Sequence, residues 1–462
     1  MIFCDLLYSK VMFFIHGGGY LIGDARPYIP TDLVADHDVI VVTVHYRLGY
    51  LGFLGTGEDF APGNNGLRDL QLALHWVKDN IRAFGGDPDD VTIFGQSAGA
   101  GCVNFLSLSP QSKGLFNKAI MQSGVAVNPW TLLTKEVATR NMLELAGRLG
   151  CLPWYHKLLP GQPSVVQQRA VECLRSKSTD EIASNFPSFE GKDPFDLLSM
   201  AFAAPFVDGD VVPNFPQALL RDVDYLRAAG VLDRKYIAGV NSMEGKLYYT
   251  GAADYNSVKN FKSLAYYSSK MFFPLSTNKE VTDMIEFVYG YPLNDDGNPP
   301  LQAMFDMYTD TTFLVPTVQL LSFIAEASPA TDTFMYLFDY SAEVKGQNGS
   351  ASRTDGAAHG LELAYLFDQS EITSIFSAGQ TLDLDTAEAR AVGDLFKGMW
   401  TSFAKTGNPA SSGQSPVWPR FDLKDRHFMK LSRNPTVEKR IYPQRVSLWL
   451  DFLPKVKSNI FG

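Results

Sequence analysis

The chain has 462 residues, of which 45% are hydrophobic and only 19% are charged, so it is able to bury a large apolar core. Its formal net charge of −10 is opposite in sign to the basic surface that binds phosphate backbones, which argues against a nucleic-acid partner. No stretch reaches about 18 consecutive apolar residues, so we expect no integral membrane segment.

The first residues of the sequence are apolar but lack the features of a secretory signal peptide. Residues 1–8 include Asp5, contain no basic segment and have no small-residue cleavage site. They lead directly into residues 11–15, an apolar run that we predict to be a core strand. We therefore expect no signal peptide within this sequence.

Short apolar, β-branched runs recur along the chain, and each ends in a glycine-rich or polar turn. We predict core strands at residues 11–15, 39–44, 91–94, 119–121, 236–240 and 334–338. Helical patterns lie between several of these runs: residues 67–84 repeat apolar side chains every three or four positions, and residues 387–406 form a second such segment. Strands that alternate with helices predict an α/β class, with a mostly parallel central sheet and helices on both faces.

Residues 131–329 are less regular, with long helical stretches that Pro and Gly interrupt. We interpret this part as helical insertions that form a lid or the walls of a gorge beside the sheet. The chain has no internal repeat, low-complexity tract or long linker, so we predict a single domain over residues 1–462.

The sequence Gly-Gln-Ser-Ala-Gly at residues 95–99 follows the predicted strand 91–94 and leads into a small-residue helix. This strand–turn–helix context is the one that a nucleophile elbow requires. A serine on such a tight turn has a strained backbone, and side chains two positions before or after it would clash, which explains both glycines. The turn raises the serine oxygen above the sheet, at a helix N-terminus that favours negative charge. We predict Ser97 as a nucleophile.

A second glycine motif, His-Gly-Gly-Gly-Tyr at residues 16–20, follows the predicted strand 11–15. Consecutive glycines leave backbone N–H groups uncovered, and such donors stabilise the oxyanion that forms during acyl transfer. We expect the donors to be the amides of Gly18, Gly19 and Ala98. A phosphate-binding loop is the alternative, but the motif lacks the lysine and the following Ser or Thr of a P-loop.

Seven histidines are candidates for the general base. In enzymes with a nucleophile elbow, the base comes after the nucleophile and the acid in the chain. That order leaves His359 and His427. His359 lies in a small-residue loop after the predicted strand 334–338, which lets an imidazole approach the serine. His427 stands among charged residues, as expected of a solvated surface turn, so we predict His359 as the base.

The position of the acid is predicted from a strand end. Glu244 follows the fifth predicted strand, where a carboxylate is able to hold the imidazole in the required tautomer and to stabilise the imidazolium. Asp208 and Asp210 are rival candidates, but they lie in what reads as an ordinary turn. The predicted triad of Ser97, His359 and Glu244 acts by acyl transfer and requires no metal or organic cofactor.

The chain has four cysteines, which are too few for a disulfide scaffold: Cys4, Cys102, Cys151 and Cys173. Cys151 and Cys173 are able to close one surface loop, which in the chain-entropy model stabilises the fold by roughly 3 kcal/mol. Two unrelated thiols are the alternative for this pair. One sequon, at residues 348–350, would suit a secreted protein.

Together these residues resemble the type-B carboxylesterases, a family that includes cholinesterases and bile-salt-activated lipases. Residues 84–99 match the active-site signature of that family throughout, and the likeness extends from about Val11 to Pro454. Further segments similar to the family lie at residues 63–69, 121–124, 206–210, 403–409 and 445–449. The resemblance implies an α/β-hydrolase fold and the hydrolysis of a small-molecule or lipid ester by a secreted or extracellular protein.

The resemblance also implies roles for individual residues. The acid of the family is a glutamate, and Ser123 would be a hydrogen-bond donor to it. Arg47 and Asp69 would form a buried structural ion pair. Cys151 and Cys173 would form the loop disulfide of the family.

Two features depart from the family pattern. Members have a substantial segment before the strand that precedes the glycine motif, whereas only ten residues precede Val11 here, so we expect that an N-terminal segment is missing and that Cys4 has lost its partner. Residue 96 is Gln, where cholinesterases usually have Glu. A neutral amide offers no charge to a quaternary ammonium group, so choline esters are disfavoured.

The main alternative is a non-catalytic adhesion or interaction domain, similar to the neuroligins. Those proteins typically lose the nucleophile or another member of the triad. Ser97, Glu244 and His359 are all present here beside an intact glycine motif, so we favour the enzyme.

Overall fold

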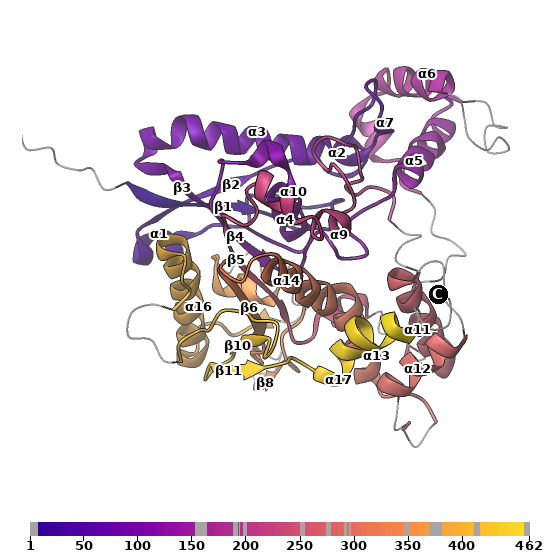
Figure 1. The fold of residues 1–462 in the computed structure, drawn as a ribbon. Coiled ribbons are helices and arrows are strands. Elements are labelled where there is room, and N and C mark those ends of the chain that lie inside the picture. The colour runs from indigo at the N-terminus through magenta and orange to yellow at the C-terminus, as the bar shows by residue number, and fades with distance from the viewer. Residues whose placement is uncertain are drawn as a thin grey trace, which may run out of the picture.

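The computed structural model describes residues 8–152, 164–187, 193, 195–196, 201–249, 255–273, 279–290, 293–294, 297–345, 351–368, 381–410 and 416–456. An eight-stranded sheet runs through it in the order β11-β10-β6-β5-β4-β3-β1-β2 (Figure 1). Neighbouring strands pair in parallel, except that β10 and β11 are antiparallel. The strands are β1 (Ser9–Ile15), β2 (Val39–Val44), β3 (Gly86–Gln96), β4 (Lys118–Gln122), β5 (Lys235–Asn241), β6 (Thr333–Phe338), β10 (His427–Leu431) and β11 (Thr436–Lys439).

All six predicted strands are present in this sheet, most of them with bounds one or two residues longer than the apolar run. β4 and β6 are buried at every position, as expected for strands covered on both faces. The sequence analysis missed β10 and β11 at one edge. All four side chains of β11 are exposed, so this strand has no apolar pattern by which to recognise it.

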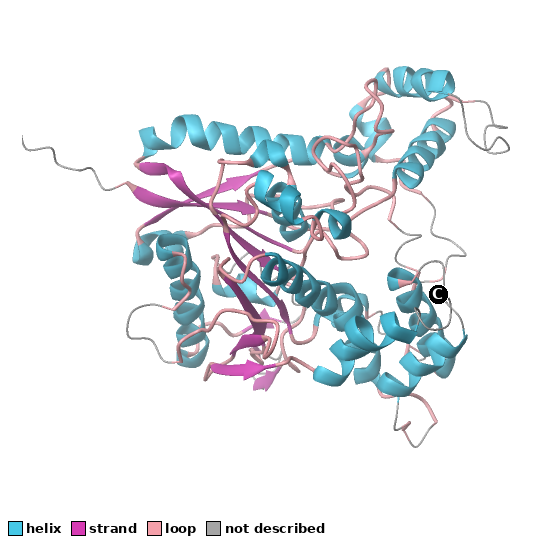
Figure 2. Ribbon diagram, viewed as in Figure 1, coloured by secondary structure: helices cyan, strands magenta, loops and turns pink. Residues whose placement is uncertain are grey.

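Side chains along β1 alternate between two hydrophobic clusters on opposite faces of the sheet. Val11, Phe13 and Ile15 belong to one cluster, and Met12 and Phe14 belong to the other, because successive side chains of a strand point to opposite faces. Helices that contribute to the first cluster are α3 (Asn65–Asn80), α4 (Ala98–Leu108) and α14 (Val315–Ala327), and those of the second are α1 (Thr31–His37) and α16 (Ala387–Thr406). The predicted α/β fold, with a mostly parallel sheet between helices, is confirmed (Figure 2).

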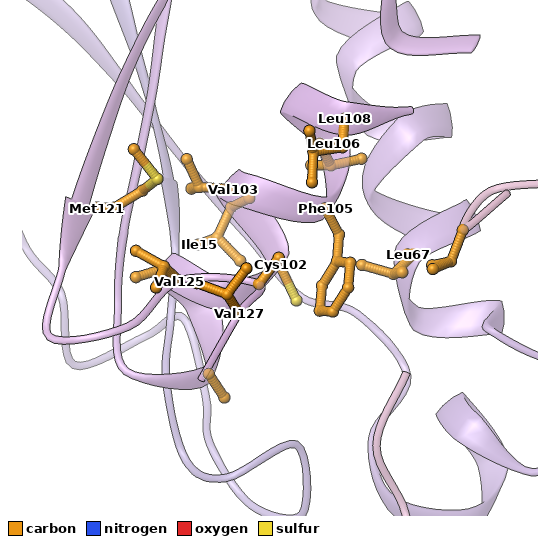
Figure 3. Packing of buried hydrophobic residues seen from close by; sticks show 14 of the residues in the cluster. Ile15, Leu67, Cys102, Val103, Phe105, Leu106, Leu108, Met121, Val125 and Val127 are labelled. Carbon is orange, nitrogen blue, oxygen red and sulfur yellow. The ribbon is translucent and has the colours of Figure 1, made fainter. Parts of the chain in front are cut away.

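The two predicted helical segments also form helices. α16 has the predicted bounds: Thr386 caps its first turn by accepting a hydrogen bond from the Ala389 backbone N–H (3.1 Å), and Gly407 ends it in the left-handed conformation. The segment 67–84 forms α3 and then a 3₁₀ turn. Figure 3 shows Leu67 of α3 beside Phe105 of α4 in the first cluster.

Besides the helices that cover the sheet, two groups of helices lie at its side (Figure 1). The first contains α5 (Lys135–Arg148), α6 (Ser164–Arg175) and α7 (Thr179–Ala183). The second contains α11 (Val258–Phe272), α12 (Lys279–Gly290) and α13 (Leu301–Thr309), and it has a hydrophobic cluster of its own. The short helix α17 (Pro443–Ser447), which comes later in the chain, packs against α12. Both groups are the helical insertions that the irregular central part of the sequence predicts.

Shorter elements complete the described part of the chain. A three-stranded sheet is formed by β7 (Glu343–Lys345), β8 (Ala351–Arg353) and β9 (Thr381–Leu382). The other helices are α2 (Gly49–Phe53), α9 (Pro216–Leu219), α10 (Val223–Ala228) and the 3₁₀ turns Ile81–Phe84, Pro110–Ser112, Glu244–Tyr248 and Leu361–Tyr365. Two π-helical turns occur, η5 (Asp310–Leu314) and η7 (Leu448–Phe452).

The disulfide between Cys151 and Cys173 is confirmed; it joins the end of α5 to α6 across a Cα–Cα distance of 5.5 Å. Cys102 is a buried free thiol in α4. Cys4 and the sequon at residues 348–350 lie outside the described residues. Among the helices that the structure describes, none is both long and apolar enough to cross a bilayer.

The ion pair between Arg47 and Asp69 forms, with Nη2 of Arg47 2.7 Å from Oδ1 of Asp69 and Nε 2.8 Å from Oδ2. The prediction that this pair is buried is wrong, because 52% of the Arg47 side chain is exposed. The guanidinium lies at the surface, where water screens its attraction to the carboxylate.

Candidate active site

Ser97 occupies the turn between β3 and α4, with φ of 58° and ψ of −125°. The backbone N–H of Ser97 donates to the Gln122 carbonyl (2.8 Å), which anchors the turn to β4. A Cβ at Gly99 would lie 2.0 Å from the Ile15 carbonyl oxygen, and a Cβ at Gly95 would lie 2.7 Å from the Gly99 backbone. Only glycine fits at both positions, so the strained turn has the form that the sequence predicts for a nucleophile elbow.

His359 and Glu244 meet in the interior, although 115 positions separate them in the chain. Nδ1 of His359 lies 2.5 Å from Oε2 of Glu244, whose side chain is completely buried. Oε1 of Glu244 accepts a hydrogen bond from the Asn241 backbone N–H at the end of β5 (2.7 Å). Both carboxylate oxygens are thus occupied. An ionised carboxylate in this position requires a hydrogen on Nδ1, which leaves Nε2 with a free lone pair in the neutral imidazole.

Nε2 of His359 lies 3.1 Å from the amide Nε2 of Gln96, the residue that precedes the serine. Among the described residues, Gln96 is the one hydrogen-bond partner of Nε2 of His359. No hydrogen bond joins this nitrogen to the hydroxyl of Ser97 there. Ser97 and His359 nevertheless line the same cavity, together with Gln96. From the sequence, residue 96 differs from that of cholinesterases in being neutral, and the contact of Gln96 with His359 was not predicted.

The glycine motif borders the same cavity. A Cβ at Gly17 would lie 3.0 Å from Cβ of Ser97, so the loop passes directly beside the serine. Gly18 has φ of 114° and Gly19 has φ of 63°, and a Cβ at Gly18 would lie 1.9 Å from the Ile22 carbonyl oxygen. Within the described residues, none of the predicted donors, the amides of Gly18, Gly19 and Ala98, donates a hydrogen bond to another group. These three N–H groups are therefore available to a ligand.

His16, the first residue of the glycine motif, makes two contacts with Tyr46. Its ring stacks on Tyr46 with 4.6 Å between ring centres, and the Tyr46 hydroxyl donates to the His16 carbonyl (2.8 Å). Burial lowers the pKa of His16, so its imidazole is neutral at neutral pH. The ring supports the loop and offers no charge to the cavity.

The shared cavity has a volume of about 700 Å³ and is mainly apolar. Its walls include Leu21 and Ile22 after the glycine motif, Trp130 and Phe202 from the insertions, and Phe313 from η5. Among the described residues that line it, Asp24 is the one carboxylate. Arg26 forms hydrogen bonds with this carboxylate and lowers its pKa, so the charge of Asp24 is already paired.

The turn η5 supports the wall nearest to the imidazole. The ring of Phe313 lies 4.8 Å from the ring of His359, and the Thr312 carbonyl accepts a hydrogen bond from the Trp130 indole N–H (2.8 Å). A π-helical turn inserts one extra residue into a helix and so redirects the side chains that follow. This turn was not predicted from the sequence, because its extra residue depends on packing against neighbouring helices.

A second buried carboxylate, Glu362, lies behind the triad candidates. Its Oε2 accepts from the Asn241 side-chain amide (2.5 Å), which also donates to the Ala358 carbonyl (2.7 Å), and its Oε1 accepts from Gln122 (3.3 Å). Burial and, next, the charge of Glu244 raise the pKa of Glu362 to about 7. Asn241 therefore connects the segment that contains Glu244 with the loop that contains His359. The sequence analysis missed Glu362, although an acidic residue within an otherwise apolar run was a usable signal.

The hydrogen bond predicted between Ser123 and Glu244 is not formed. The Ser123 hydroxyl is buried without a hydrogen-bond partner among the described residues, while its backbone N–H donates to the Gly239 carbonyl (2.9 Å). The two oxygens of Glu244 are already taken by His359 and the Asn241 backbone. The Ser123 hydroxyl therefore does not support the carboxylate of Glu244 in the described part of the chain.

The rival candidates are engaged in ion pairs and hydrogen bonds elsewhere in the molecule. Asp208 and Asp210 both pair with Arg68, at 3.1 and 2.6 Å. His427 begins β10 and forms a hydrogen bond with Asp422 through its Nδ1, away from Ser97. None of the three lines the cavity that Ser97 and His359 share.

Comparisons with known proteins show which family the chain belongs to. A family model described as "Carboxylesterase family" matches residues 7–449. Neuroligin-2 of Mus musculus is 32% identical over 467 residues, which cover 96% of this chain and 51% of that protein. The chain thus spans about half the length of the first curated relatives that it matches.

Relatives named as enzymes match over a similar share of the chain. Cocaine esterase of Homo sapiens is 32% identical over 450 residues, covering 96% of this chain and 72% of the esterase. Bile salt-activated lipase of Bos taurus is 30% identical over 442 residues, covering 92% of this chain and 68% of the lipase. From the family match, these relatives and the fold, we conclude that the chain belongs to the carboxylesterase family, the type-B carboxylesterases.

Proposed function

We propose that the protein is a carboxylic ester hydrolase that acts through an acyl-enzyme, with Ser97 as nucleophile, His359 as base and Glu244 as acid. One observation carries the proposal: a serine on a strained strand–helix turn shares a cavity with an imidazole whose other nitrogen is paired with a fully buried glutamate. Nucleophile, base and orienting carboxylate are the three roles that acyl transfer to serine requires.

In the first half-reaction, the Ser97 oxygen attacks the ester carbonyl while Nε2 of His359 takes the hydroxyl proton. The imidazolium then returns this proton to the leaving alcohol as the carbon–oxygen bond of the ester breaks. In the second half-reaction, water takes the place of the alcohol and releases the acid. Glu244 favours both protonation states that the cycle needs, because it accepts the Nδ1 hydrogen throughout.

The glycine motif supplies the expected anion site. The amides of Gly18, Gly19 and Ala98 stand free beside Ser97, and Ala98 begins α4, where the helix dipole adds positive potential. Loss of one such donor typically costs about 3 kcal/mol of transition-state stabilisation.

The cavity favours a neutral ester with apolar groups, a small molecule or a lipid. Its walls are largely aromatic and aliphatic, and Gln96 puts an uncharged amide beside the base. Burial of apolar substrate surface supplies the affinity, at roughly 25 cal/mol per Å² removed from water. Among the described residues that line the cavity, Asp24 is the one carboxylate with which a cationic substrate could pair, and it already pairs with Arg26.

We further infer that the chain acts as one domain and works outside the cell. The disulfide between Cys151 and Cys173 suits an oxidising compartment. The net charge of −10 gives no support to a nucleic-acid partner.

A non-catalytic interaction domain is the second candidate, because Neuroligin-2 is as similar to this chain as cocaine esterase is. The two candidates differ in chemistry at one atom, the hydroxyl oxygen of Ser97. An interaction domain has no need of a serine that forms an acyl-enzyme.

The experiment is turnover of p-nitrophenyl esters of graded chain length by the purified chain. We expect wild type to hydrolyse them, Ser97→Ala to lose at least about 10³-fold in kcat, and Ser184→Ala, at an exposed serine, to match wild type. Circular dichroism and thermal melting check that each variant is folded. No turnover by folded wild type, or full turnover by folded Ser97→Ala, contradicts the proposal.

A further inference from the structure

Gln96 is the last residue of β3, and its side chain is completely buried. Its amide nitrogen lies 3.1 Å from Nε2 of His359, while its amide oxygen, Oε1, is buried without a hydrogen-bond partner among the described residues. A Cβ at Gly17 would lie 3.0 Å from this oxygen and 2.7 Å from the Gln96 carbonyl, so the glycine motif leaves just enough room for the amide.

The orientation of this amide follows from the charge state of its neighbours. Glu244 holds the hydrogen on Nδ1 of His359, so Nε2 of the neutral ring is an acceptor and the amide must present an N–H to it. Once the ring has taken up a proton, Nε2 carries a hydrogen and the same N–H would repel it. A half-turn about the last side-chain bond would then bring the unpartnered Oε1 against Nε2.

We propose that Gln96 is a two-way hydrogen-bond partner of His359, which donates to Nε2 in the resting protein and accepts from it when the ring is an imidazolium. This inference rests on the proposed function only for its kinetic consequence. In the ester hydrolase, the amide satisfies the base while the site is empty, gives way to the Ser97 hydroxyl, and stabilises the imidazolium of the tetrahedral intermediate. No bond is made or broken by Gln96 itself.

The charged groups around the ring are few and do not replace this contact. Glu244 faces Nδ1 at 2.5 Å, and Glu362 acts on the ring through its charge from behind Asn241. Glu244 lies on the Nδ1 side of the imidazole, and Glu362 forms a hydrogen bond with Asn241. Among the side chains of the described residues, Gln96 is the one that forms a hydrogen bond at Nε2, the nitrogen that exchanges the proton.

Two substitutions separate the roles of the amide. Gln96→Met keeps the size of the side chain and removes both donor and acceptor, so we expect kcat to fall about tenfold or more with little change in KM. Gln96→Glu places a carboxylate against Nε2, so the pair retains a shared proton to higher pH. The acid limb of kcat/KM should then move up by about one pH unit. Gln71→Met is the matched control, because Gln71 is also a buried amide but bonds to Ser109 and Ser112.

A spectroscopic readout keeps the inference testable without turnover. In protein labelled with ¹⁵N-histidine, the hydrogen bond shifts the Nε2 resonance of His359 upfield, so Gln96→Met should move it downfield and Gln71→Met should not. A response of this resonance in a protein without esterase activity would support the contact and overturn the proposed function. Esterase activity in which Gln96→Met leaves the resonance, kcat and pH profile like those of Gln71→Met would overturn the inference and leave the proposed function standing.

Discussion

Glu244 is the residue whose surroundings restrict its role most narrowly. It is fully buried, and its two oxygens accept from His359 and from the Asn241 backbone. A buried carboxylate whose two oxygens each accept a hydrogen bond is held in one orientation against the imidazole. We therefore propose that Glu244 fixes the orientation of the ring and the position of the ring hydrogen.

Replacing Glu244 with glutamine tests this role. The amide keeps the shape but offers an N–H toward Nδ1, which favours the wrong tautomer, so we expect kcat to fall about 10³–10⁴-fold. The exposed Glu326→Gln is the control for a neutralised glutamate. Steady-state kinetics on a p-nitrophenyl ester measures the effect, and a folded Glu244→Gln protein within tenfold of wild type would refute the assignment.

At this scale, residues that stand in a local motif or follow a predicted strand could be predicted, including the distant partners His359 and Glu244, whereas the contact of Gln96 with His359 could not. Ser97 and Gly18 stand in short motifs whose glycines indicate, from the sequence alone, a tight turn and an uncovered backbone. Gln96 and His359 are 263 positions apart, and nothing local to either one indicates that their side chains touch. The missing Ser123 bond has the same cause, since the distance between Ser123 and Glu244 depends on how segments far apart in the sequence pack together.

The elements that form the site are a strand end, a glycine loop and two insertions. The six core strands could be predicted because their side chains are apolar on both faces. The edge strand β11 could not, because it is exposed at every position, and η5 could not, because its extra residue depends on packing against neighbouring helices. Hence the wall made by Phe313 was visible only in the structure.

The first group of insertions depends on its disulfide. The bond between Cys151 and Cys173 closes a loop of 22 positions, which in the chain-entropy model stabilises the fold by roughly 3 kcal/mol. We expect the double variant Cys151→Ser, Cys173→Ser to lose stability of this order in urea unfolding.

Reduced wild type serves as the comparison for that variant, because it lacks the bond but keeps both sulfur atoms. Reduction should bring wild type to the stability of the double variant and should leave the variant unchanged. A double variant as stable as oxidised wild type would show that the bond contributes nothing.

At the scale of the whole molecule, the pH dependence of the free energy of unfolding depends on the protonation of Glu362, the second buried carboxylate. Burial raises the pKa of Glu362 to about 7 from its ordinary 4.5, so between these values the folded protein binds more protons at this site than the unfolded chain. Its contribution to stability is present below about pH 4.5 and is lost as the pH rises toward 7. The loss amounts to at most about 3 kcal/mol.

Glu362→Gln removes this component. The free energy of unfolding of the variant, relative to wild type, should rise between pH 4.5 and 7 and should be constant outside that range. Asp310, whose pKa burial also raises to about 7, is present in both proteins and cancels in the difference. Denaturant unfolding at a series of pH values measures this difference. A difference in the free energy of unfolding that does not change with pH would contradict the raised pKa of Glu362.

The central claim is that Ser97 is a nucleophile activated by a paired imidazole within one apolar cavity. The most direct measurement is peptide mapping by mass spectrometry after treatment with a fluorophosphonate, which forms a covalent adduct only with an activated serine. We predict one adduct, on Ser97, in wild type, and strongly reduced labelling in Glu244→Gln. Folded protein that stays unmodified at Ser97, or that is labelled equally well in both forms, would contradict the claim.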